Sequence, residues 1–221
     1  MDSSFTEKES LALIGQMIST AKNNLQKGTG TVFLLWGYLV ALISLVTFLL
    51  LLILPEPARY NAFYLWFLMA AGFPFHYLLV RRLENGPQVR TYIEQLMAWV
   101  WIAFTITILV AVAGLLAATA YRSANPGAPG AEGWFHWLFM TPFMLCLYGF
   151  ALFVSGKAYR FRPLVSGGMF CMAAALVSLG FIYYSRITEL NQIILCLSAI
   201  AGFIIPGHLL NGKQAKDVQG A

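Results

Sequence analysis

The chain has 221 residues, of which 59% are hydrophobic and only 10% carry a formal charge. Soluble domains carry about 25% charged residues, so this composition excludes a water-soluble globule and predicts a protein whose solvent is lipid. Three cysteines, an odd number, exclude a disulfide framework. The net charge of +5 is scattered over several segments. We interpret it as a topology signal and contact with anionic lipid, not as nucleic-acid binding.

The first 30 residues are predicted to be a tail that contains one amphipathic helix. Apolar residues recur there at three- and four-residue steps from Leu11 to Leu25, and Lys, Asn and Gln occupy the other side. Gly28 and Gly30 end the pattern. We therefore expect a helix over about residues 7–26. It either lies on the membrane surface or forms a docking face for a protein partner or for a second copy of the chain.

Six apolar runs follow, each about 20 residues long, the length that crosses the hydrocarbon core as a helix. None contains Asp, Glu, Lys or Arg, so all 14 basic and 9 acidic residues fall in tails and connections. Because lipid offers no partners for backbone polar groups, each run should be helical. The predicted spans are Thr31–Leu54, Ala62–Val80, Leu96–Ala120, Trp134–Val154, Leu164–Tyr184 and Leu190–Leu210.

The sequence thus predicts an all-α membrane protein, a bundle of six transmembrane helices over residues 31–210. A polar tail at 211–221, which we expect to be disordered, follows it. Of the 14 basic residues, eleven fall on one side of the spans and only three, Arg59, Arg122 and Arg186, on the other. Cytoplasmic segments are rich in Lys and Arg, so both termini should be cytoplasmic. The six tryptophans lie near span ends, where amphipathic rings favour the headgroup region.

Prolines interrupt the second, fourth and sixth spans. Pro74, Pro142 and Pro206 each remove a helix hydrogen bond and should free the carbonyl four residues earlier. One interpretation is a kink without function, because neighbouring helices re-satisfy such groups. The other is a cavity for a solute, since broken helices line the substrate sites of transporters. Thr141, beside Pro142, would then supply a polar wall near mid-membrane.

Histidines are the titratable groups within the spans. His76 and His208 fall near the cytoplasmic ends of the second and sixth spans, whereas His136 lies near the opposite end of the fourth. If the second and sixth spans touch, the first two could ligate a metal or haem, or act in a pH response. The alternative is an interfacial role in which each ring bonds to the backbone or to headgroups.

The connection between the fourth and fifth spans is the most concentrated basic turn. It carries Lys157, Arg160 and Arg162, and Ser166 and two glycines follow at the start of the fifth span. Backbone N–H groups at a helix start, together with arginine, hold anions. The expected occupant is a lipid-headgroup phosphate or a cytoplasmic anionic ligand.

Small residues predict where helices approach closely. The pairs Ala113/Ala117 and Gly114/Ala118 have the small-xxx-small spacing that lets helix backbones pack against each other in membranes. Polar side chains within the spans are expected to hydrogen-bond across helices or to line a polar path.

No pattern in the sequence points to an enzyme. The chain has no phosphate-binding glycine loop, no Gly-x-Ser-x-Gly elbow and no HExxH helix. Paired carboxylates for acid–base chemistry are not supported either, because the spans contain no Asp or Glu. We therefore expect no catalytic residues, no cofactor and no metal.

Three stretches of the sequence are similar to a known group of proteins: ESLALIGQMISTAKNNL at 9–25, SGKAYRFRPLVSGGMFC at 155–171 and IIPGHLL at 204–210. The combination resembles a group of small six-span membrane proteins of Bacteroidetes bacteria that have no assigned activity. The resemblance implies a bacterial inner membrane and six spans. It implies no substrate, cofactor or catalytic residue.

The sequence supports two hypotheses for the function. The first is a non-enzymatic accessory or regulatory component that acts through partners, because the chain combines an amphipathic helix with spans free of charge. The second is a transporter or channel for a small solute, with a cavity lined by the three proline-bearing helices.

Overall fold

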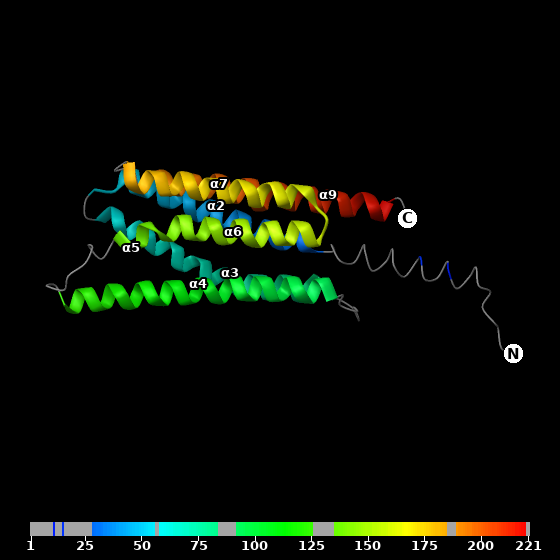
Figure 1. The fold of residues 1–221 in the computed structure, drawn as a ribbon, viewed down its shortest axis with the longest axis horizontal. Helices are drawn as coiled ribbons and strands as arrows, with labels where there is room; N and C mark the ends of the chain where they lie inside the picture. Colours follow the sequence, from blue (N-terminus) through cyan, green and yellow to red (C-terminus); the bar gives the residue numbers. More distant parts are fainter. Residues whose placement is uncertain are drawn as a thin grey trace.

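A computed structural model describes residues 28–55, 58–83, 92–125, 135–184 and 189–219, together with Leu11 and Gly15. These residues form helices and no strand, so the all-α prediction is confirmed (Figure 1). The amphipathic helix predicted at 7–26 lies outside them, apart from Leu11 and Gly15. The elements are α2 (Thr29–Ile53), the 3-10 helix η1 (Ala58–Leu68), α3 (Met69–Leu83), α4 (Tyr92–Ala124), α5 (Phe135–Leu138), α6 (Met140–Ala158), α7 (Arg162–Tyr184), α8 (Leu190–Ala199), the π-helix η2 (Ile200–Ile204) and α9 (Ile205–Gln219).

Six helical segments of the described chain are long and apolar enough to cross a membrane, which makes the protein a multi-pass membrane protein. Most of these helices run side by side along one axis (Figure 1). The start of α2, the end of α3, the α6–α7 turn and the end of α9 lie at one end of the bundle, which we call the basic end. It holds Arg81, Arg82, Lys157, Arg160, Arg162 and Lys213.

The helices α6 and α7 form the closest pair in the fold. A Cβ added to Gly168 would lie 2.7 Å from the backbone nitrogen of Phe153, and one added to Gly149 would lie 2.9 Å from the carbonyl oxygen of Gly168. The two backbones therefore touch, which small residues permit in membrane helices. The chain then crosses α7 again, because a Cβ on Gly167 would lie 2.9 Å from the Cα of Gly202 in η2.

The last span packs along the full length of α2. A Cβ on Gly30 would lie 2.8 Å from the carbonyl oxygen of Gly207, and one on Gly37 would lie 2.8 Å from the Cβ of Phe203. The helices α2, α6, α7 and the continuous α8–η2–α9 thus form a tightly packed four-helix core. Their buried residues include Leu145, Leu152 and Leu164, which have no exposed surface.

Two helices lie outside this core. The η1–α3 segment crosses the bundle obliquely, and α4 runs along its side (Figure 1). Met97 is the single buried residue of α4, and Ala62 and Gly72 are the buried residues of η1 and α3. The helix α4 has 33 residues, a length of about 50 Å against a hydrocarbon core of about 30 Å. It therefore extends beyond both ends of the span predicted at 96–120.

The C-terminal segment differs from its prediction. We expected the residues after Leu210 to be a disordered tail, but α9 continues through them to Gln219. The reason is that a helix already held in the bundle needs no new nucleus to extend, and the Lys, Gln and Ala of this segment are favourable helix formers. The disordered-tail prediction is wrong for these residues.

Candidate functional site

The two predicted site histidines bind to aromatic side chains of α2. The indole N–H of Trp36 donates a hydrogen bond to Nδ1 of His76 across 3.2 Å. The hydroxyl of Tyr38 lies 2.8 Å from Nε2 of His208. Because residues two apart on a helix point about 200° apart, α2 stands between the two imidazoles. The structure therefore does not bring His76 and His208 together as a ligand pair, and no cluster of three metal-ligating side chains occurs in the described chain.

A ring of five aromatic side chains joins α2, α4, α6 and η2. Its neighbours have centroids 5.1–6.1 Å apart, mostly edge to face, the favourable range for aromatic pairs. The members in order are Phe33, Trp101, Phe104, Tyr148 and Phe203. Sequence reasoning missed this ring and placed Trp101 in the headgroup region. The ring forms only after helix packing fixes which faces meet, so no spacing signal marks it.

The ring packs α4 against the core. Trp101 and Phe104 are the two members that α4 contributes, and Phe203 comes from the π-helix. A π-helix has an extra residue per turn and is frequent at functional sites. Here the N–H of Ile205 donates to the carbonyl of Ile200, and Pro206, which has no N–H, follows immediately. The wider turn thus accommodates the proline that the sequence predicted to break this span.

The other two prolines occupy different environments. Pro142 is the third residue of α6, after a turn at Phe139 that separates α5 from α6. Its missing N–H thus falls in the first helical turn, where N–H groups have no partner in the helix. It is buried, and Thr141 is partly buried. Pro74 lies inside α3 and is exposed. The three prolines do not converge on one enclosed space.

A polar seam lies between α2 and the last span. The antiparallel register fixed by Thr31 and Asn211, whose side chains are 3.3 Å apart, places Ser44 level with Ser198. Seven buried polar side chains belong to the core helices: Ser44, Thr47, Ser155, Ser178, Asn191, Gln192 and Ser198. The Ser178 hydroxyl donates to Oδ1 of Asn191 across 3.0 Å.

Several atoms of this seam are without a hydrogen-bond partner among the described residues. They are Oγ of Ser44 and Ser198, Oγ1 of Thr47 and Oε1 of Gln192, and outside the seam the buried Oγ of Ser155 in α6 also has none. A buried polar atom without a partner costs about 1–3 kcal/mol. These neutral hydroxyl and amide groups can bind water or a small polar solute by hydrogen bonding, but they carry no charge for acid–base chemistry.

The basic turn between α6 and α7 has a defined backbone. The N–H of Phe161 donates to the carbonyl of Gly156 at 2.8 Å, and the N–H of Arg160 donates to that of Lys157 at 3.2 Å. This is a Schellman motif, whose left-handed position is usually glycine. Arg160 occupies that position with φ of 50°. The side chains of Lys157, Arg160 and Arg162 are exposed.

Tyr159 precedes this turn and connects it to two other helices. Burial raises the pKa of Tyr159 to about 12, the Glu94 carboxylate of α4 adds to the rise, and a hydrogen bond with Thr29 of α2 opposes it. The neutral phenol therefore joins the ends of α2 and α6, and Glu94 of α4 lies near enough to disfavour its ionisation.

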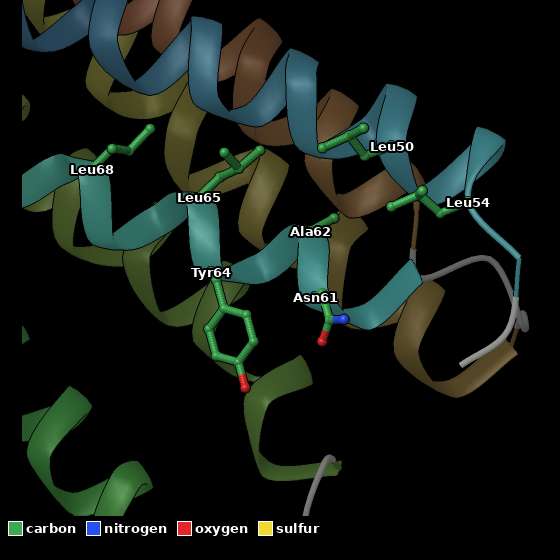
Figure 2. A pocket seen from close by; sticks show the side chains of 7 residues that line it. All are labelled: Leu50, Leu54, Asn61, Ala62, Tyr64, Leu65 and Leu68. Carbon is green, nitrogen blue, oxygen red and sulfur yellow. The ribbon is translucent and has the colours of Figure 1, made fainter. Parts of the chain in front are cut away.

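The opposite end of the bundle has an ion pair. The guanidinium of Arg59, at the start of η1, pairs with the carboxylate of Glu189, which precedes α8, and both side chains are largely shielded from solvent. Beside it, a groove of about 330 Å³ separates the end of α2 from η1. Figure 2 shows leucines of both helices facing this groove, whereas Asn61 and Tyr64 point away from α2. The groove has no charged lining and suits an apolar occupant.

No protein-family model, no curated protein and no solved structure matches this chain.

Proposed function

We propose that the protein is a non-enzymatic accessory component of a bacterial inner membrane that acts by binding a partner within the bilayer. The observation that carries the proposal is the position of α4. This helix contacts a closely packed core through the aromatic ring, the buried Met97 and a partly buried stripe along its length, and the face turned away from the core is exposed. The closely packed core favours an accessory role over transport, because it encloses no open path for a solute within the part of the chain that the structure describes. It can instead hold α4 in place for a partner.

The face of α4 that binds the partner carries small residues. Ala103, Thr107, Gly114 and Ala117 recur at helical spacing, and all are exposed. A Cβ at Gly114 would meet nothing within 4 Å. The close packing predicted at Gly114 is therefore not used inside the described chain, and another transmembrane helix fits against this face. The amphipathic segment 7–26 is a second proposed contact, on the cytoplasmic side.

The proposal includes the orientation of the helix bundle in the membrane. The basic end faces the cytoplasm, with both termini, because cytoplasmic connections are rich in Lys and Arg. Seven basic residues of the described chain support this, against Arg59 and Arg122 at the other end. Reporter fusions after residues 57, 87 and 221 test it. Opposite locations for the last two fusions would overturn it.

The experiment for the partner uses two glycines that differ only in location. Gly114 in α4 and Gly180 in α7 both have open space where a side chain would begin, so a leucine at either site leaves the core intact. The full chain is purified from native membranes in mild detergent as wild type, Gly114→Leu and Gly180→Leu, and as a variant without residues 1–27. A co-purifying membrane protein that is lost with Gly114→Leu and retained with Gly180→Leu supports the proposal. If neither Gly114→Leu nor the truncation loses a partner, the proposal is wrong.

The second candidate function is a carrier or channel for a small neutral solute. The polar seam favours it, because unpartnered hydroxyls of α2 and α8 lie at the same level of the core. Of the three prolines proposed to line a cavity, only Pro206 belongs to a helix that borders the seam. Ser44→Cys and Ser198→Cys, in a chain whose own cysteines are replaced, test water access. A hydrophilic thiol reagent that labels both positions favours transport, and protection of both excludes an open path.

A further inference from the structure

A second groove lies on the face of the bundle formed by α7, η2 and α9. It has a volume of about 540 Å³ and begins at the basic end with Arg162 and Ser166. Leu209 lies at this end too, because α9 runs toward the basic end, and the groove continues between Phe170 of α7 and Ala201 and Ile205 of the last span. Its floor is formed where Gly167 lets α7 touch η2. The eight residue steps from Arg162 to Phe170 rise by about 12 Å along the helix, so the groove runs from the membrane surface into the apolar layer.

The chemistry of the groove changes along this depth. Arg162 is the one charged residue of its lining, and the lining contains no carboxylate. Neither Arg162 nor Arg160 forms a salt bridge with a described residue. Ser166 donates its hydroxyl to the carbonyl of Pro163, which leaves its oxygen as an acceptor only. Below this level the lining consists of Phe170, Ala201 and Ile205, which are purely apolar.

The backbone at Arg160 adds a constraint on the same turn. A non-glycine residue in the left-handed region costs about 1–2 kcal/mol of backbone strain, which glycine would avoid. The chain nevertheless places arginine there, two residues before Arg162. The strained turn holds a second guanidinium beside the mouth of the groove.

We propose that this groove binds an anionic phospholipid of the bilayer leaflet at the basic end. The headgroup phosphate lies at Arg162 and Arg160, and one acyl chain passes Leu209 and lies along Ile205 and Phe170. Charge complementarity selects an anionic headgroup, because neither cation has a counter-ion among the described residues. The apolar continuation selects a lipid over a free anion, because a free phosphate would leave the deep part of the groove unfilled.

The experiment compares spin-labelled phosphatidylglycerol with spin-labelled phosphatidylcholine of the same acyl chains, in proteoliposomes that contain the full chain. The measured quantity is the ratio of the two association constants, from the motionally restricted fraction of each label. Arg162→Gln should lower the ratio about fivefold, the effect of one basic residue near an anionic surface. Arg81→Gln, which removes a charge from the same end of the bundle but outside the groove, is the matched control and should leave the ratio unchanged.

A second pair of variants tests the apolar part. Ser166→Trp fills the groove, whereas Met169→Trp puts the same side chain on an exposed position of α7 that does not line it. Ser166→Trp should reduce the restricted fraction of phosphatidylglycerol and Met169→Trp should not. Thermal unfolding in detergent verifies that both variants are folded. If Ser166→Trp does not fold, the proposal is tested by the association-constant ratio of Arg162→Gln alone.

Three results would overturn the proposal. An equal loss with Arg162→Gln and Arg81→Gln would show general surface attraction and not a site. An unchanged ratio with Arg162→Gln would remove the headgroup contact. Displacement of labelled phosphatidylglycerol by inorganic phosphate alone would show a site for a free anion. Retained binding in the presence of excess inorganic phosphate, together with the groove-specific losses, supports the lipid.

Discussion

The hydroxyl of Tyr38 lies 2.8 Å from Nε2 of His208. This contact joins α2 to α9, and the bond from Trp36 to His76 joins α2 to α3 on the other side of the same helix. Each histidine ring thereby has a hydrogen-bond partner within the bundle. The interaction is inter-helical, so it differs from two roles that the sequence predicted for these residues, a joint ligand set and a contact with backbone or headgroups. The predicted pH response stays a prediction.

Removing the two partners should have unequal effects on stability. Trp36→Phe leaves Nδ1 of the partly buried His76 without its donor and should cost about 1–3 kcal/mol. Tyr38→Phe removes a bond at an exposed position and should cost about 0.5–1.5 kcal/mol or less. Unfolding in mixed detergent, followed by circular dichroism, measures both. A larger loss for Tyr38→Phe would contradict the assigned burial of the two pairs.

The aromatic ring should contribute most of the attachment of α4. Phe203→Ala removes its buried central member and should destabilise the protein by about 3–5 kcal/mol. Phe150→Ala, on an exposed position of α6, is the control and should change the free energy of unfolding little. Trp101→Ala should in addition raise hydrogen exchange in α4 while α6 and α7 stay protected. Uniform exchange across all helices would show that α4 is not a separately attached element.

Hydropathy predicted the fold because lipid imposes a strict rule on the backbone. The six spans and their charge-free character follow from that rule. Their ends did not follow from it. The helix α4 continues to Tyr92 and Ala124, because a helix can project past the hydrocarbon layer without breaking a hydrogen bond. Trp134 was predicted to start the fourth span, but Pro142 forces the break between α5 and α6.

The candidate sites were less predictable, because they depend on register between helices. The positions of Lys157, Arg160 and Arg162 in one turn could be read from the sequence. The groove beside them could not, because it requires Gly167 to meet Gly202 from another span. The aromatic ring and the polar seam likewise combine residues more than 100 positions apart. The left-handed Arg160 gave no signal, since that position is usually glycine.

The glycines at helix crossings should tolerate alanine very differently. Gly168→Ala would place Cβ 2.7 Å from the backbone nitrogen of Phe153, so the helices α6 and α7 must separate. We expect a loss of more than about 2 kcal/mol, as for overpacked cores. Gly114→Ala meets open space and should stabilise by about 0.5–1 kcal/mol through helix propensity. Equal melting temperatures for the two variants would contradict the close crossing.

Glycine at position 160 should separate stability from lipid binding. Arg160→Gly relieves the left-handed strain and should stabilise the fold by about 1 kcal/mol. The same substitution removes a guanidinium beside the groove and should lower the preference for phosphatidylglycerol. Arg162→Gly is the control, because it lies in helical backbone at the start of α7 and should destabilise by about 0.5–1 kcal/mol. A destabilised Arg160→Gly protein would show that the arginine stabilises the turn.

Tyr159 should make the fold sensitive to strongly alkaline solution. Its pKa is about 12 in the folded protein, above its ordinary value of 10.0, with burial as the main cause. The unfolded state therefore loses the phenolic proton first as the pH rises. The stability that the neutral phenol contributes is complete below pH 10 and is lost between pH 10 and 12. The total loss in the free energy of unfolding amounts to roughly 2–3 kcal/mol. Unfolding of wild type and Tyr159→Phe in detergent across this window measures it, with ultraviolet absorbance reporting phenolate formation. The two proteins should lose stability at different rates above pH 10, and parallel curves would show that Tyr159 ionises as a solvated phenol.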